Sequence, residues 1–80
     1  MVGRRSKTLD KAFGIALRRV RLGSQLTQEQ LALESGVQRN FISLIETGQN
    51  QPSITTIHRL ATALGLKASE LVAEAEGELE

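Results

Sequence analysis

The side chains with the most specific hydrogen-bonding chemistry lie together near the middle of the chain, at Gln38, Arg39 and Asn40. A guanidinium group can donate two parallel hydrogen bonds to the two acceptors of guanine, and an amide group can donate to and accept from adenine. Ile42 and Ile45 follow at helical spacing, so the polar residues fall on the opposite face of one helix. This pattern indicates a helix whose first turn presents base-reading groups.

A second short helix is expected immediately before it, starting near Gln28. Thr27 can cap this helix through its side-chain oxygen, and Gln30 lies where an amide side chain satisfies the free backbone donors of a first turn. Leu31 then faces inward, and Gly36 supplies the permissive backbone that a tight corner needs. Residues 26–48 therefore predict a helix-turn-helix.

Three further helices are expected around this motif. Apolar residues at helical spacing predict helices over residues 10–22, 53–64 and 67–75, with Gly23, Gly48 and Gly65 near the ends of helices. Pro52 prevents the helix that carries Arg39 and Asn40 from continuing, and Ser53 can cap the helix over residues 53–64. No alternating strand pattern or internal repeat is visible, so the predicted fold class is all-α, with five helices in one small domain.

The formal charge of +1 conceals an uneven distribution of charged residues. Residues 1–68 carry ten Lys or Arg and four acids, whereas residues 69–80 carry five glutamates and no basic residue. A basic domain attracts polyanions. We expect residues 1–8 to form a flexible basic arm, residues 9–76 the domain and residues 77–80 an acidic tail. Contact of the arm with phosphates or the minor groove is the rarer alternative to simple solvation.

The sequence offers little to other function classes. There is no cysteine for a disulfide or a thiolate metal site, and the lone His58 has no histidine partner at metal-binding spacing. No nucleophile and base pair or glycine-rich phosphate loop is evident, so we expect no enzyme activity, no cofactor, no metal and no small-molecule ligand. No apolar run is long enough to span a bilayer, and we expect a cytoplasmic protein.

Residues 26–48 resemble the helix-turn-helix motif of the Xre/Cro family of phage-repressor-type regulators. With Gln28 as the first motif position, Ala32 is the small residue and Gly36 the turn glycine, and the core positions are Leu31, Val37, Ile42 and Ile45. The likeness extends over about residues 13–72. It implies a compact five-helix, lambda-repressor-like domain that binds double-stranded DNA, with restriction-modification controller proteins and small phage Cro proteins as the most similar sub-classes.

The resemblance also implies roles for individual residues. Arg39 and Asn40 match base-reading positions, Ser43 matches a position that contacts backbone or base, and Leu44 is placed for apolar contact with a thymine methyl. The phosphate-contact candidates are Thr27, Gln28, Gln38, Asn50, Gln51 and Ser53. Gln38 can instead act as a cap, and residues 50–53 can instead form a solvated loop. In the family, the residues matching Arg21 and Glu46 form an ion pair that closes the recognition helix. The side on which Phe41 lies stays open.

A domain this small is expected to act as a homodimer on a palindromic operator, because two copies can place recognition helices in successive major grooves. The candidate dimer residues are Leu66, Leu71, Val72 and Ala75, which are equally suited to covering the core. One alternative is an antitoxin-like or other protein-interaction module with the same helical fold, which the basic first helix and polar recognition face disfavour. The other is a DNA-binding piece of a larger protein.

Overall fold

The structure is a computed structural model that describes the backbone of residues 2–79 and the side chains of residues 9–79. Within this part it contains α-helices and no strand, in the order α1 (Val2–Gly23), α2 (Gln28–Ser35), α3 (Arg39–Glu46), α4 (Ile54–Ala63) and α5 (Ala68–Gly77). The prediction of an all-α, five-helix domain is confirmed. None of the helices described is long and apolar enough to cross a membrane.

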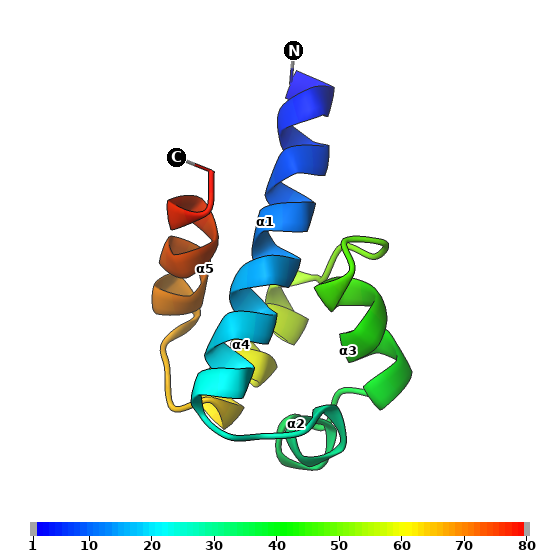
Figure 1. The fold of residues 1–80 in the computed structure, drawn as a ribbon, viewed down its shortest axis with the longest axis vertical. Helices are drawn as coiled ribbons and strands as arrows, with labels where there is room; N and C mark the ends of the chain where they lie inside the picture. Colours follow the sequence, from blue (N-terminus) through cyan, green and yellow to red (C-terminus); the bar gives the residue numbers. More distant parts are fainter. Residues whose placement is uncertain (1, 80) are drawn as a thin grey trace.

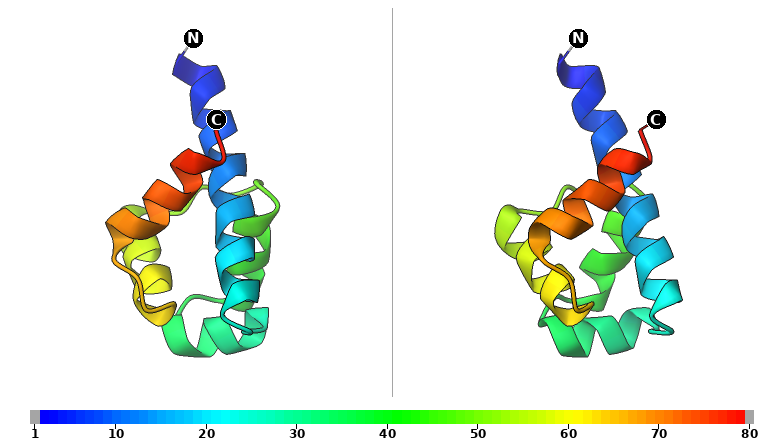
Figure 2. Two further views of the ribbon diagram at one scale, coloured as in Figure 1. Left: turned by 60° about the vertical axis from the view of Figure 1, so that its left-hand side comes forward. Right: turned by 90° about the vertical axis from the view of Figure 1, so that its left-hand side faces the viewer.

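The long helix α1 runs along the longest axis of the molecule, and its first turns extend past the other helices (Figure 1). It packs against α3 and α5, while α4 packs against α2 and α5. The short helix α2 lies across the end at which α1 stops, and both chain termini lie at the opposite end in all three views (Figures 1 and 2).

The core is built from the inward faces of all five helices. Its buried members are Phe13, Ala16, Leu17, Leu31, Val37, Ile42, Ile45, Leu60, Ala61, Leu71 and Ala75. Fully burying a Leu or Ile side chain contributes about 1.5–3 kcal/mol, and six such side chains are almost completely buried here. The core therefore holds α3 against α1, and α2 against α3 and α4, although α2 and α3 have only eight residues each.

Side-chain caps explain why α2 and α4 begin where they do. The Thr27 hydroxyl accepts a hydrogen bond from the Gln30 N–H at 3.0 Å, and the Thr27 N–H donates to the Gln30 side chain at 2.8 Å. The Ser53 hydroxyl likewise accepts from the Thr56 N–H at 3.1 Å. At the end of α2, Gly36 has φ +74°, a left-handed conformation that favours glycine. The predicted starts of α2 and α4 and the predicted corner at Gly36 are confirmed.

The two ends of the chain differ from expectation. The first helix begins at Val2 rather than near residue 10, so the backbone of residues 2–8 continues α1. The side chains of the arm and all of Met1 lie outside the described residues, and a role for the arm on DNA stays a prediction. The apolar residue Ile54, the first of α4, is 81% exposed and lies outside the core.

The expected acidic tail is partly helical and in contact with the domain. Helix α5 continues to Gly77, and the Arg19 side chain of α1 pairs with Glu74 at 2.9 Å and with Glu78 at 3.1 Å. The hydrogen bonds that Arg19 donates to Glu74 and, second, to Glu78 raise the pKa of the Arg19 guanidinium. Glu74 and Glu78 therefore contact α1 through Arg19, while their side chains stay 46% and 27% exposed. Glu80 lies outside the described residues.

The packing of α1 on α3 predicts the effect of Gly14→Ala. An added Cβ would lie 2.7 Å from the Glu46 carbonyl oxygen and closer still to that of Ile45, and backbone atoms cannot move aside cheaply. We expect a loss of about 1–3 kcal/mol in the free energy of unfolding, measured by urea denaturation. Gly23→Ala is the control, because its Cβ would meet nothing within 4 Å. Equal stability of the two variants would contradict this packing.

Candidate nucleic-acid interface

The first turn of α3 presents the two strongest candidates for base recognition. Arg39 and Asn40 are both exposed, whereas Ile42 and Ile45 on the opposite face are completely buried. Gln38 precedes them as the N-cap residue and makes no side-chain capping bond, so its amide is also available to a ligand. The start of α3 and its N-cap thus combine a fixed apolar side with an exposed guanidinium and two exposed amides.

The next turn of α3 is less accessible. Ser43 and Leu44 are half-buried, so a ligand would reach them only in part. Phe41, whose side the sequence left open, is half-buried and packs against the core cluster. The accessible chemistry of α3 is therefore concentrated at its N-terminus.

Candidate phosphate contacts lie at the start of α2 and in the loop that follows α3. At the start of α2, the Thr27 hydroxyl accepts a bond from Gln30 but keeps its own proton for donation. In the loop of residues 47–53, which follows α3, the backbone N–H groups of Gln49 and Asn50 donate to the Leu44 carbonyl at 2.9 and 3.3 Å. These bonds hold the loop against α3. In Figure 1 this loop follows the upper end of α3.

In that loop, Gln51 is exposed and Asn50 is half-buried. Ser53 is exposed, but its hydroxyl already accepts the N–H of Thr56 and lies 3.1 Å from the Thr56 hydroxyl. A capping hydroxyl can still share its remaining hydrogen-bonding capacity with a ligand. The loop therefore presents several polar groups, and hydrogen bonds hold it to α3 at one end and to α4 at the other.

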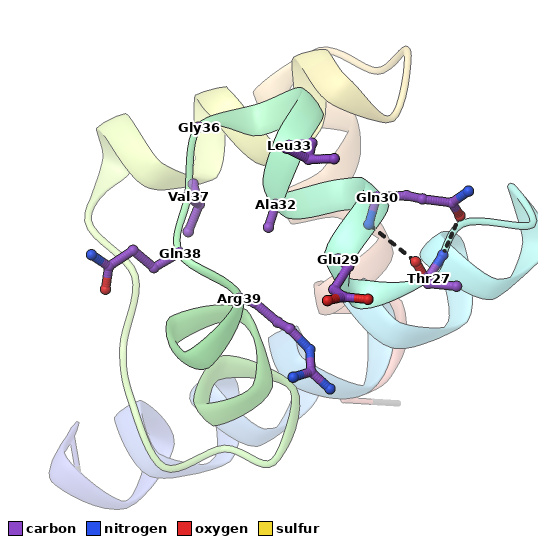
Figure 3. Close-up of a pocket in the computed structure, with 9 residues that line it drawn as sticks. All are labelled: Thr27, Glu29, Gln30, Ala32, Leu33, Gly36, Val37, Gln38 and Arg39. Atoms are coloured by element: carbon purple, nitrogen blue, oxygen red, sulfur yellow. Dashed lines mark hydrogen bonds between the residues drawn. The ribbon is translucent and has the colours of Figure 1, made fainter.

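An open groove of about 890 Å³ separates α2 from the start of α3. Figure 3 shows Gln38 and Arg39 leaving the start of α3 in different directions. The lining residues are Thr27, Glu29, Gln30, Ala32, Leu33, Gly36, Val37, Gln38 and Arg39. Leu33 lines this groove and is 86% exposed, and it is not among the site residues predicted from the sequence. Its apolar type at an outward helical position was the available signal.

A buried ion pair fixes the other end of α3. Arg21 Nε lies 2.6 Å from Glu46 Oε2, and Arg21 Nη2 lies 3.0 Å from Glu46 Oε1, which is a bidentate arrangement. The two side chains are 8% and 4% exposed. Arg21 Nη1 also donates to the Leu26 carbonyl at 2.8 Å. The pair that the resemblance implies is thus present, and it joins α1, the loop before α2 and the last turn of α3.

Gln28 also donates a hydrogen bond to the carboxylate of the ion pair, which was not predicted from the sequence. Gln28 Nε2 donates to Glu46 Oε1 at 3.1 Å. Gln28 was expected only as a phosphate contact, and residues 18 positions apart carry no pattern that reveals such a bond. The carboxylate of Glu46 therefore links the first residue of α2 to the last residue of α3.

The expected dimer residues do not form one accessible surface. Leu71 and Ala75 are 0% and 1% exposed and belong to the core of the single chain, so they are not available to a second copy. Helix periodicity in the sequence identified an apolar side of α5, but it did not show that the core of the same chain covers this side. Leu66 and Val72 are half-buried and retain part of their surface.

Comparison with known proteins identifies the family. Residues 12–75 match the model of the helix-turn-helix domain. The chain belongs to this helix-turn-helix family of DNA-binding regulators. Its Xre-like motif, predicted from residues 26–48, is confirmed by the same match and by the relatives described next.

The chain is 37% identical over 62 residues to an uncharacterised HTH-type transcriptional regulator of Sinorhizobium fredii, covering 78% of this chain and 80% of that one. It is 38% identical over 61 residues to the control protein C.BamHI of Bacillus amyloliquefaciens, covering 75% of each. Among solved structures, the restriction-modification controller protein C.AhdI of Aeromonas hydrophila matches with a TM-score of 0.75 and 40% identity, over 78% of this chain and 94% of that one.

The buried ion pair predicts a large coupling energy in this helix-turn-helix protein. Arg21→Ala or Glu46→Ala should each cost about 3–5 kcal/mol in the free energy of unfolding, because the remaining charge is left buried without its partner. A double-mutant cycle by urea denaturation measures the coupling. The exposed pair of Arg19 and Glu74 is the matched control and should show a far smaller coupling. Additive effects at Arg21 and Glu46 would contradict this assignment.

Proposed function

We propose that this regulator binds a two-fold symmetric operator as a homodimer, and that Arg39 and Asn40 of each copy read base pairs in the major groove. The observation that carries the proposal is the first turn of α3, where both side chains are exposed while Ile42 and Ile45 hold the opposite face in the core. A bidentate donor for guanine and an amide for adenine thus project from a helix that is fixed in position.

Contacts to the DNA backbone are proposed on both sides of these residues. Thr27 and Gln28 would donate to a phosphate at the start of α2, where free backbone N–H groups and the helix dipole also favour an anion. Gln38 lies at the N-cap of α3, and the loop residues Asn50, Gln51 and Ser53 would contact the backbone beyond the other end of α3. Ser43 and Leu44 would contribute secondary contacts to bases, since both are half-buried.

Dimerisation would place two copies of α3 in successive major grooves, about 34 Å apart along the duplex. Leu66 and Val72 support a contact surface at α5 and the loop before it, because both keep part of an apolar side chain accessible. The similarity to the restriction-modification controller C.AhdI supports a controller role over an antitoxin role.

Selection of bound sites from random DNA tests the operator proposal directly. We expect the selected sequences to contain two inverted half-sites about one helical turn apart. Selection of a single, asymmetric short site would contradict binding as a symmetric dimer. Failure to bind DNA at both low and moderate salt would instead favour a protein partner, since phosphate contacts make binding strongly salt-dependent.

Two substitutions separate base recognition from backbone contact. Arg39→Ala should cost about 1–3 kcal/mol on the selected site and relax the preference at one base pair, whereas Gln28→Ala should weaken binding to all sequences alike. Both are measured by titration of the selected and a scrambled duplex. Arg59→Ala removes a positive charge from an exposed side chain of α4 outside the proposed interface and serves as the control. Unchanged discrimination in Arg39→Ala would show that Arg39 does not read a base.

The dimer surface predicts the behaviour of Val72→Glu. We expect the parent chain to sediment as a dimer and this variant to shift toward monomer, because a carboxylate would be desolvated at the contact. Ala73→Glu changes an exposed neighbour on the same helix and should leave the dimer intact. Circular dichroism checks that both variants remain helical. A folded Val72→Glu chain that still sediments as a dimer would place the interface elsewhere.

A further inference from the structure

We infer that Glu46 is a positioning residue for DNA binding, which holds the Gln28 side chain ready for a backbone phosphate. This inference rests on the proposed function, in which Gln28 contacts a phosphate. The supporting geometry is the 3.1 Å hydrogen bond that Gln28 Nε2 donates to Glu46 Oε1. It connects the first residue of α2 to the last residue of the recognition helix α3.

Arg21 makes this arrangement compatible with a nearby phosphate. A carboxylate alone would repel the anion, but two hydrogen bonds from Arg21 to Glu46, at 2.6 and 3.0 Å, form a pair with no net charge. Burial strengthens this pairing, since the side chains of Arg21 and Glu46 are 8% and 4% exposed. Glu46 can therefore orient the Gln28 amide with little electrostatic penalty for the phosphate.

The Gln28 amide retains a donor for the ligand. A side-chain amide carries two N–H groups, and the bond to Glu46 uses one of them. Gln28 is half-buried rather than enclosed, so the second N–H can face solvent. Because the bond to Glu46 already restricts the rotatable bonds of Gln28, less side-chain freedom remains to be lost when DNA binds.

The arrangement couples two parts of the interface through one helix. The first turn of α3 carries Arg39 and Asn40, and its last residue, Glu46, acts on the phosphate contact at α2. A displacement of α3 would therefore weaken base recognition and the phosphate contact together. The loop carbonyl of Leu26, which accepts from Arg21 at 2.8 Å, anchors the same network to the residue before Thr27.

A binding cycle tests the inference on the full chain. Gln28→Met removes the amide at similar length and leaves the pair of Arg21 and Glu46 unaltered, whereas Glu46→Asp withdraws the carboxylate by one methylene from both Gln28 and Arg21. Affinity for a scrambled duplex is measured at two salt concentrations, at a temperature where circular dichroism shows every variant folded. We expect each single variant to bind about three- to tenfold more weakly, and the double variant to bind no more weakly than Gln28→Met alone.

Nuclear magnetic resonance of the side-chain amides measures the mobility of Gln28 directly. A Glu46 that only stabilised the fold would leave this mobility unchanged. The Gln28 amide should be ordered in the parent chain without DNA and mobile in Glu46→Asp, while the exposed Gln51 amide should be mobile in both. Gln28→Asn provides a second test that leaves Arg21 and Glu46 unaltered. Its amide is too short to reach Glu46, so it should bind DNA as weakly as Gln28→Met.

The outcomes distinguish this inference from the proposed function. If the parent chain selects an operator but the losses from Gln28→Met and Glu46→Asp add, Glu46 does not act through Gln28 and the inference fails alone. It also fails if Gln28→Met or Gln28→Asn binds as the parent does. If the parent chain binds no DNA at either salt concentration, the proposed function and this inference are overturned together.

Discussion

The position of the recognition helix depends on the contact between the last turn of α3 and α1. Gly14 allows the two backbones to approach, and the buried pair of Arg21 and Glu46 fixes the same end by three charge-assisted hydrogen bonds in all, including that from Gln28. An eight-residue helix has little stability of its own in water. Contacts with α1 and α2 therefore fix the orientation of α3, and with it the position of the exposed first turn.

Local signals made the centre of the chain predictable. The starts of α2 and α4 follow from side-chain caps at Thr27 and Ser53, and the corner between α2 and α3 follows from one glycine that adopts a left-handed conformation. Each signal acts over four residues or fewer, so tertiary packing seldom overrides it. The accessible Arg39 and Asn40 could be predicted for the same reason, because the buried and polar faces of α3 alternate with helical periodicity.

Features that depend on contacts between distant segments were not predictable in this way. The apolar side of α5 was visible, but only the packed structure shows that Leu71 and Ala75 are covered within the single chain. The same holds for the bond between Gln28 and Glu46, which joins two helices, and for Glu74 of α5 and Glu78 after it, which pair with Arg19. A glycine inside a predicted helix, at Gly14, was a signal of close packing that could have been used.

The shortness of α3 limits how much sequence information one copy can read. Eight residues span about 12 Å at 1.5 Å per residue, which corresponds to about three or four base pairs at 3.4 Å per step. Each fully specified base pair contributes two bits, so one recognition helix supplies at most about eight bits, far below the roughly 20 or more needed to single out one site among the ~10⁶–10⁹ that a genome offers. A unique address on the chromosome therefore requires information beyond one copy of α3, from a second copy or from the shape of the DNA itself.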